Sequence, residues 1–254
     1  FFFQAKDGIR IYQCDWSSDV CSSDLWVYPA ALQSQPAEHE RRSIIEYSLS
    51  ALGPAGVPVT SREVRLVPRE ADLVSARLLV RNAGRKILLH PGSRSAFRMW
   101  PAANFAAVCD RVQDELGAQV FVLGGPGEQD TVNAIRAAAK SHLVTINTAL
   151  GLAQFAALAA QFDLMLCHDS GPMHVAAAVG TPVVALLGSQ NPVVFAPAGP
   201  GHTLLQPPLP CTACVAPGQC VPGDSYRNLC VRNITVDRVV AAVREKLSGK
   251  SRHS

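Results

Sequence analysis

The sequence lacks the features that mark membrane-spanning, nucleic-acid-binding and dinucleotide-binding proteins. No apolar run approaches the roughly 20 residues that a membrane-spanning helix needs. Aromatic residues make up only 6% of the chain, and no run of Lys and Arg with interleaved aromatics points to nucleic acid. The ordered glycine spacing of a dinucleotide fingerprint is also missing, which argues against NAD. A hydrophobic content of 48% over 254 residues is nevertheless enough to bury a large core.

The first 25 residues do not read as part of a folded domain. Residues 4–10 and 15–25 resemble translated sequencing-adaptor DNA with an index between them. We therefore treat residues 1–25 as an artefact and leave them out of the fold prediction.

From residue 86 onward, short apolar runs alternate with helical runs. We expect strands at residues 86–89, 119–123, 143–146, 164–167, 183–187 and 203–205. We expect helices at residues 102–116, 128–140, 152–161, 173–179 and 236–247. Strands separated by helices of about ten residues imply parallel βαβ units with right-handed crossovers. The predicted fold class is α/β, with a doubly wound, parallel, Rossmann-like sheet.

The pattern is weaker on either side of these units. Residues 43–52 are typical of a helix, whereas residues 53–58 and 62–70 predict an irregular connector. After Gly188 the periodicity is lost among prolines and glycines as far as Pro222, apart from the strand at 203–205.

Residues 168–181 are the most informative stretch, because a polar turn joins an apolar strand to an Ala-rich helix. Asp169, Ser170 and Gly171 occupy this turn. The first N–H groups and the dipole of a helix attract phosphate or carboxylate, and Gly171 lets an anion approach the backbone. Helix capping alone would also explain the Asp and the Ser. His174 falls in the first helical turn, where packing alone favours an apolar residue.

These residues resemble glycosyltransferase family 9, the ADP-heptose:lipopolysaccharide heptosyltransferases. The similar segments are Asp-Ser-Gly-Pro-Met-His at 169–174, Gly-Thr-Pro-Val-Val-Ala-Leu-Leu-Gly at 180–188, His-Pro-Gly-Ser at 90–93, Arg-Met-Trp-Pro at 98–101, and Gly-Gly at 124–125 with Glu128. Together they extend over about residues 85–247.

The resemblance implies an enzyme with the GT-B fold, in which two Rossmann-like domains face each other across a catalytic cleft. Residues 83–254 would form the nucleotide-sugar (donor) binding domain, and residues 26–82 a remnant of the acceptor-binding domain with the interdomain connector. The implied reaction is inverting, metal-independent transfer of heptose from ADP-heptose to a lipopolysaccharide inner-core acceptor. The family's proposed Asp base belongs to the amino-terminal half and matches no residue here, so we expect this chain alone to be inactive.

The resemblance also implies roles at the turn. Asp169 would accept hydrogen bonds from hydroxyls of the donor sugar, and the backbone N–H groups of Ser170 and Gly171 would hold the diphosphate. His174 would support the turn or approach the phosphate. A histidine satisfied between helix and strand is the alternative for His174.

Three further residues complete the implied site. Arg98 stands where many relatives carry Lys, in a position to stabilise charge on the departing ADP as a catalytic residue, although Arg offers a planar fork and Lys a point charge. Ser93 is a candidate phosphate or sugar contact, and Glu128 would bind the ribose hydroxyls. Alternatively, Arg98 is a surface cation, Ser93 is a turn residue, and Glu128 is an acidic residue that complements a helix dipole.

Two segments depart from the family pattern and leave base and sugar specificity open. Residues 147–150 lie near the expected adenine pocket, and Gly-Ser-Gln-Asn-Pro at 188–192 replaces a commoner Gly-Pro/Ser-Thr.

The cysteine pattern offers one metal hypothesis. Four thiols within twenty residues, spaced C-x2-C-x5-C-x9-C, fit a structural zinc site, and paired or free thiols are the alternative; they are Cys211, Cys214, Cys220 and Cys230. We expect no other cofactor, because a nucleotide sugar is a substrate. Cys109 and Cys167 are predicted to be small core residues.

The expected partners are ADP-heptose or a related nucleotide sugar and a lipopolysaccharide core acceptor at the membrane surface. A net charge of +3 suits such anionic molecules. The expected location is the cytoplasm, at the inner membrane face. Two other functions stay open: a non-catalytic nucleotide-binding module, and a GT-B enzyme that uses a UDP-sugar.

Overall fold

The computed structural model describes residues 42–80, 84–93, 98–125, 127–147, 149–188, 190–207 and 229–249. The chain divides into two compact units, Phe1–Arg62 and Glu63–Ser254. In the first unit the structure describes helix α2 (Ile44–Ser50), whose cap Ser43 accepts a hydrogen bond from the backbone of Glu46 at 3.2 Å. The adaptor-like residues 1–25 lie outside the described residues. The expected boundary at residue 83, between the remnant of the acceptor-binding domain and the donor-binding domain, stays a prediction.

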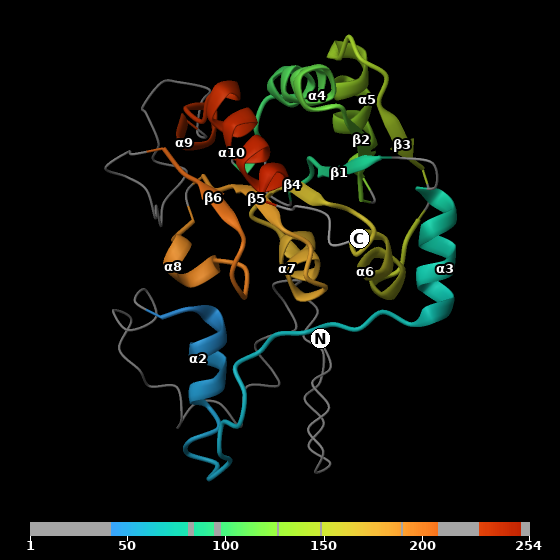
Figure 1. Cartoon of the computed structure of the whole chain (residues 1–254). Coiled ribbons are helices and arrows are strands. Elements are labelled where there is room, and N and C mark those ends of the chain that lie inside the picture. Colours follow the sequence, from blue (N-terminus) through green and yellow to red (C-terminus); the bar gives the residue numbers. More distant parts are fainter. Residues whose placement is uncertain are drawn as a thin grey trace. The chain divides into compact units, whose positions relative to one another are not determined.

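The second unit is built on a parallel sheet with the strand order β3-β2-β1-β4-β5-β6 (Figure 1). The strands are β1 (Arg85–His90), β2 (Ala118–Leu123), β3 (Val144–Ile146), β4 (Leu164–His168), β5 (Val183–Leu186) and β6 (Thr203–Leu205). Every neighbouring pair runs parallel, as βαβ crossovers require. The predicted doubly wound α/β sheet is therefore confirmed.

Helices cover both faces of this sheet (Figure 1). One face carries α4 (Ala102–Leu116), α5 (Gln129–Ala138) and α10 (Val236–Ser248). The other carries α3 (Glu70–Leu79), α6 (Leu152–Ala159) and α7 (Gly171–Ala178). The short helices α8 (Pro192–Phe195) and α9 (Leu229–Arg232) complete the described elements of this unit.

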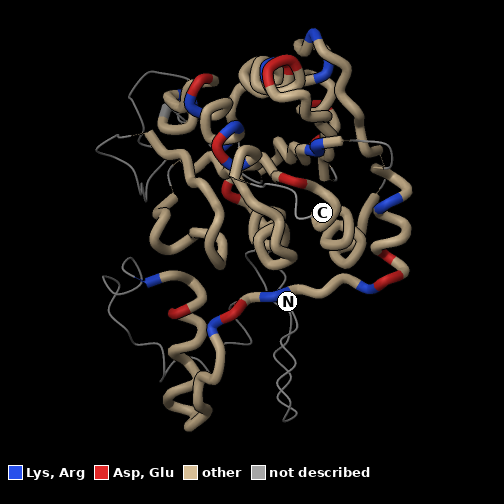
Figure 2. Tube along the Cα trace, viewed as in Figure 1, with Lys and Arg blue, Asp and Glu red and all other residues tan. Residues whose placement is uncertain are grey.

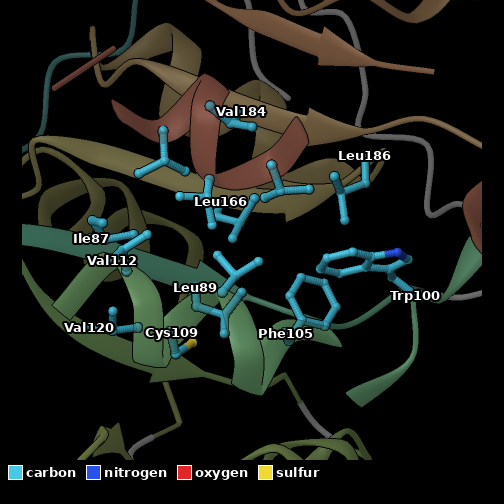
Figure 3. Packing of buried hydrophobic residues seen from close by; sticks show 14 of the residues in the cluster. Ile87, Leu89, Trp100, Phe105, Cys109, Val112, Val120, Leu166, Val184 and Leu186 are labelled. Atoms are coloured by element: carbon cyan, nitrogen blue, oxygen red, sulfur yellow. The ribbon is translucent and has the colours of Figure 1, made fainter. Parts of the chain in front are cut away.

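Alternation along the strands divides the core between the two faces. Ile87 and Leu89 pack with α4 and α10, whereas Leu88 between them packs on the opposite side. Figure 3 shows the first cluster, in which Trp100 meets Phe105 edge to face with ring centroids 5.0 Å apart. Because helices shield both faces, the strands are apolar along almost their whole length.

Residues 57–69 contain no helix or strand, as the connector predicted at 62–70 requires, but helix α3 follows them where the sequence pattern predicted no element. Ala76 is buried, and Val74, Leu78 and Leu79 are exposed. The apolar residues of α3 therefore lie on several sides of the helix. The sequence has no single apolar stripe from which this helix could be predicted. The preceding segment is also anchored, since the backbone N–H of Leu66 donates to the carbonyl of Ala178 at 2.8 Å.

Helix α8 is the second correction, because the sequence pattern predicted no element there. Asn191 caps it by accepting a hydrogen bond from the N–H of Val193 at 2.9 Å, and Pro192 occupies the first turn. The pair Asn-Pro also favours turns, so the sequence alone did not reveal a helix of one turn. The bounds of the predicted elements otherwise agree with the structure within two residues.

Charged residues of both signs are interspersed along the described chain (Figure 2). Ion pairs tie α4 to α10, with Arg111 beside Asp237 and Arg244 beside Glu115. These partly exposed pairs stabilise little. Among the described residues, no helix combines the length and the apolar character needed to cross a bilayer.

Candidate functional site

The candidate site lies where β1 and β4 end side by side. Their register aligns His90 with Cys167. From β1 the chain continues toward β2 on one side, and from β4 toward β5 on the other. Ligands of open α/β sheets bind at such a switch point, outside the carboxyl ends of the strands.

Asp169, the first residue after β4, forms an ion pair with Arg98. The Asp169 side chain is 7% exposed, and its Oδ2 lies 3.4 Å from Nη1 of Arg98, which is 35% exposed. Burial raises the pKa of the Asp169 carboxyl, and the charge of Arg98 opposes that shift. Two residues 71 positions apart in the sequence, both expected in the site, are therefore brought together.

Gln190, in the loop after β5, is a third member of this cluster. With its side-chain oxygen facing Arg98, it accepts hydrogen bonds from Nε at 3.2 Å and from Nη2. The opposite amide orientation would set N–H groups against N–H groups. Sequence reasoning noted this segment only as a departure from the family pattern. The available signal was a polar side chain following a buried parallel strand.

The amino terminus of α7 lies at the same edge. Ser170 has extended backbone angles (φ −158°, ψ 165°), and its side chain makes no capping bond to the helix. Its Oγ instead donates to the carbonyl of His168 at 3.3 Å. A Cβ atom added to Gly171 would meet no atom within 4 Å, so space is open beside this backbone. Capping by the side chain of Ser170 therefore does not explain this residue.

His174 lies one turn into α7 and is half-buried. Burial lowers the pKa of its ring, so the ring is neutral near pH 7. Burial is the sole cause of this shift, with no hydrogen bond from the described residues contributing to it. A neutral imidazole can donate a hydrogen bond to a ligand at this edge.

The end of β1 is packed more tightly. The N–H of Gly125 donates to Oε2 of Glu128 at 2.6 Å, and Nε2 of His90 lies 3.6 Å from the same oxygen. A Cβ atom on Gly92 would overlap the Glu128 carboxylate. Ser93 follows at this edge and is half-buried. Glu128 and the end of β1 therefore meet, and Ser93 follows this strand end in the chain.

His168, the last residue of β4, is a positioning group that sequence reasoning did not single out. It is fully buried, and its Nε2 accepts a hydrogen bond from the backbone N–H of Trp100 at 2.8 Å. The Trp100 indole in turn donates to the carbonyl of Ile234 at 2.9 Å. Burial lowers the pKa of His168 to about 4, which keeps the ring neutral. It therefore anchors the backbone two residues after Arg98.

The predicted zinc site involves mainly cysteines that lie outside the described residues. Cys211, Cys214 and Cys220 lie beyond it, and Cys230 is buried in α9. Within the described ranges, no group of three or more His, Cys, Asp or Glu side chains is arranged to hold a metal ion. The zinc site stays a prediction. Cys109 and Cys167 are buried in the core, and burial raises the pKa of the Cys109 thiol to about 12.

A curated relative and two solved structures resemble this chain. Lipopolysaccharide heptosyltransferase 3 of Escherichia coli is 28% identical over 161 residues, which cover 61% of this chain and 47% of the relative. A family 9 glycosyl transferase from Veillonella parvula is 24% identical with a TM-score of 0.71, covering 84% of this chain and 62% of that one. E. coli ADP-heptose LPS heptosyltransferase II is 23% identical with a TM-score of 0.61, covering 73% and 54%.

The chain spans about half the length of the curated relatives it matches. The two solved structures share its fold. The model of glycosyltransferase family 9 (heptosyltransferase) matches residues 56–222, which include both sides of the switch point. On this match, extending over more than half of the sequence, the chain belongs to glycosyltransferase family 9.

Proposed function

We propose that this chain supplies the donor-binding domain of an enzyme that transfers heptose from ADP-heptose to a lipopolysaccharide inner-core acceptor. The observation that carries the proposal is the meeting of Arg98 and Asp169 beside the start of α7 at the switch point. Family membership supports glycosyl transfer, and the E. coli relative named for ADP-heptose supports the donor.

In this proposal, different residues of the site bind different parts of the donor nucleotide sugar. Arg98 and the first amides of α7 face the diphosphate, where a cation and a helix terminus both favour negative charge. Asp169 accepts hydrogen bonds from hydroxyls of the sugar. Glu128, on the far side of the switch point, accepts hydrogen bonds from the ribose hydroxyls, and Ser93 contacts phosphate or sugar between them.

In the proposed reaction an acceptor hydroxyl attacks the anomeric carbon as the bond to the diphosphate oxygen breaks. The bonding electrons leave with ADP, and Arg98 stabilises the charge that develops there. A base that we place outside the described residues takes the proton. Attack opposite the leaving group inverts the anomeric centre, and no metal is needed because Arg98 and the helix terminus meet the diphosphate charge.

The acceptor side belongs to the proposal as well. A lipopolysaccharide core acceptor places the enzyme in the cytoplasm at the inner membrane face. We expect no turnover by this chain alone, and a product assay with ADP-heptose and core acceptor decides that point. Inversion and metal independence are tested on the product of the whole enzyme, formed with and without a chelator.

Calorimetric titration of the full chain with ADP-heptose, ADP, UDP and UDP-sugars tests the donor. We expect ADP-heptose and ADP to bind and the uridine nucleotides to bind at least tenfold more weakly, a difference of about 1.4 kcal/mol. Arg98→Ala should weaken the binding of ADP, and Arg136→Ala, which removes an exposed charge from α5, is its control. Preferential binding of UDP-sugars, or no binding by a folded chain, would overturn the donor assignment.

A further inference from the structure

We propose that Gln190 is a positioning residue that aims the Arg98 guanidinium at the donor diphosphate. This inference rests on the proposed function, because it concerns how Arg98 meets that ligand. It goes further in assigning a task to Gln190, in the loop after β5, for which the sequence pattern predicted no role.

The contacts of Arg98 occupy only some of its N–H groups. A guanidinium has five N–H groups in a fixed plane. Nε and Nη2 donate to the side-chain oxygen of Gln190, and Nη1 faces Oδ2 of Asp169 at 3.4 Å. Among the described residues this arrangement leaves one N–H on each terminal nitrogen for another acceptor. Two N–H groups on neighbouring nitrogens match two oxygens of one phosphate.

Asp169 and Gln190 compete for the Arg98 guanidinium. Asp169 carries a charge and is the more buried partner, so alone it would draw the guanidinium into a two-bond pair. Such a pair would use the N–H groups that the phosphate needs. Gln190 binds the Nε and Nη2 edge of the guanidinium through a neutral acceptor. It therefore orients the guanidinium without neutralising the charge of Arg98.

Both sides of the contact between Gln190 and Arg98 are anchored. Nε2 of Gln206, just after β6, donates to the carbonyls of Gly188 at 3.0 Å and Gln190 at 2.8 Å. On the other side, His168 holds the N–H of Trp100 at 2.8 Å. The loop that carries the acceptor and the loop that carries Arg98 are therefore each tied to the sheet.

The contact can be tested without nucleotide. NMR of the full chain follows exchange of the Arg98 Nε proton with water, the signal being assigned by its loss in Arg98→Lys. We expect Gln190→Met, which keeps the side-chain length but removes the acceptor, to speed this exchange at least threefold. Gln161→Met is the matched control, because Gln161 donates only to the carbonyl of Ala157 among the described residues, at 3.3 Å. Gln206→Met, which frees the loop, should act in the same direction as Gln190→Met.

Calorimetry with ADP then tests positioning. We expect Gln190→Met to weaken ADP binding roughly fivefold, the scale of one hydrogen bond, and to have no further effect in an Arg98→Ala background. Unchanged proton exchange in both Gln190→Met and Gln206→Met would overturn the contact. Altered exchange with unchanged ADP affinity would overturn the positioning role. A wild-type chain that binds no ADP would refute the proposed function, while the exchange measurement would still decide the contact.

Discussion

The two strand ends that meet at the switch point differ in how much space they leave. At the end of β1, Gly92 is pressed against the Glu128 carboxylate, which the N–H of Gly125 and the ring of His90 also approach. At the end of β4, the space beside Gly171 is open. Both positions carry glycine, but in one a neighbouring side chain fills the space that a Cβ atom would need, and in the other the space is free for a ligand.

The β1 side of the switch point is therefore tightly packed, whereas the β4 side has room for a ligand. The β1 side fixes Glu128 in place before any ligand arrives, and such preorganisation lowers the cost of binding. The β4 side brings together Arg98, Asp169 and the start of α7, and the space beside Gly171 is open. The predictions below test whether the phosphate belongs to the β4 side.

The largest expected effect is on stability at acid pH, through the buried His168. Burial lowers the pKa of its ring from 6.5 to about 4, so between these values the unfolded chain binds more protons than the folded one. His168 alone should therefore lower the free energy of unfolding by about 3 kcal/mol as the pH drops from 6.5 to 4. Denaturant unfolding across this range measures the fall.

The histidines of the two sides sharpen the comparison. Burial also lowers the pKa of His90, but the neighbouring Glu128 opposes that shift. His168→Gln, which retains an acceptor for Trp100, should therefore remove more of the pH dependence than His90→Gln. An unchanged pH dependence in the His168→Gln variant would contradict this assignment.

Arg98→Ala should weaken ADP binding by about 10- to 100-fold, because it removes hydrogen bonds between a cation and a phosphate worth about 1.5–3 kcal/mol. The side chain is partly exposed, so circular dichroism and the unfolding midpoint should stay near wild type. Calorimetry measures the affinity. A loss of less than twofold would move the diphosphate away from the β4 side.

Asp169→Ala should affect binding of the sugar and binding of the diphosphate differently. ADP-heptose binding should weaken about tenfold, because a carboxylate that accepts hydrogen bonds from sugar hydroxyls is lost. ADP alone should bind at least as tightly as it binds the wild type, since Asp169 repels the diphosphate and competes for Arg98. Parallel titrations with the two ligands decide this, and equal losses for both would refute the assignment to the sugar.

A pair of glycine substitutions compares the two sides directly, with the smallest expected effects. Gly171→Ala adds a methyl group in open space, so stability should stay within about 0.5 kcal/mol of wild type while ADP binding weakens several-fold. Gly92→Ala must displace the Glu128 carboxylate, so it should break the Gly125 hydrogen bond and weaken adenosine binding as well as ADP binding. Thermal unfolding and titrations with adenosine and ADP measure both. Equal adenosine affinities in the two variants would remove the distinction between the sides.

The elements that could be predicted from sequence are those whose pattern is local. The helix at Ala102–Leu116 combines apolar periodicity with a terminal glycine, Gly117, whose positive φ of 60° ends it. Strand β6 (Thr203–Leu205) stood out as a short apolar run between turn residues. Helix α3 was missed because its apolar residues lie on several sides, so its identity depends on packing against α6.

The same distinction applies to the candidate site. Asp169 and Gly171 belong to one motif, so the sequence pointed to both. Gln190 and His168 act through contacts with Arg98 and Trp100, which lie 92 and 68 residues away. No local pattern reports such contacts, because they exist only once β4 and β5 have brought distant loops to one edge.

A crystal structure of the full chain with ADP tests the central claim most directly. We predict the diphosphate beside the start of α7, with its oxygens within about 3 Å of the Arg98 terminal nitrogens and the Gly171 N–H, and the ribose near Glu128. A diphosphate bound elsewhere, with Arg98 still paired to Asp169 and the space beside Gly171 empty, would contradict the account.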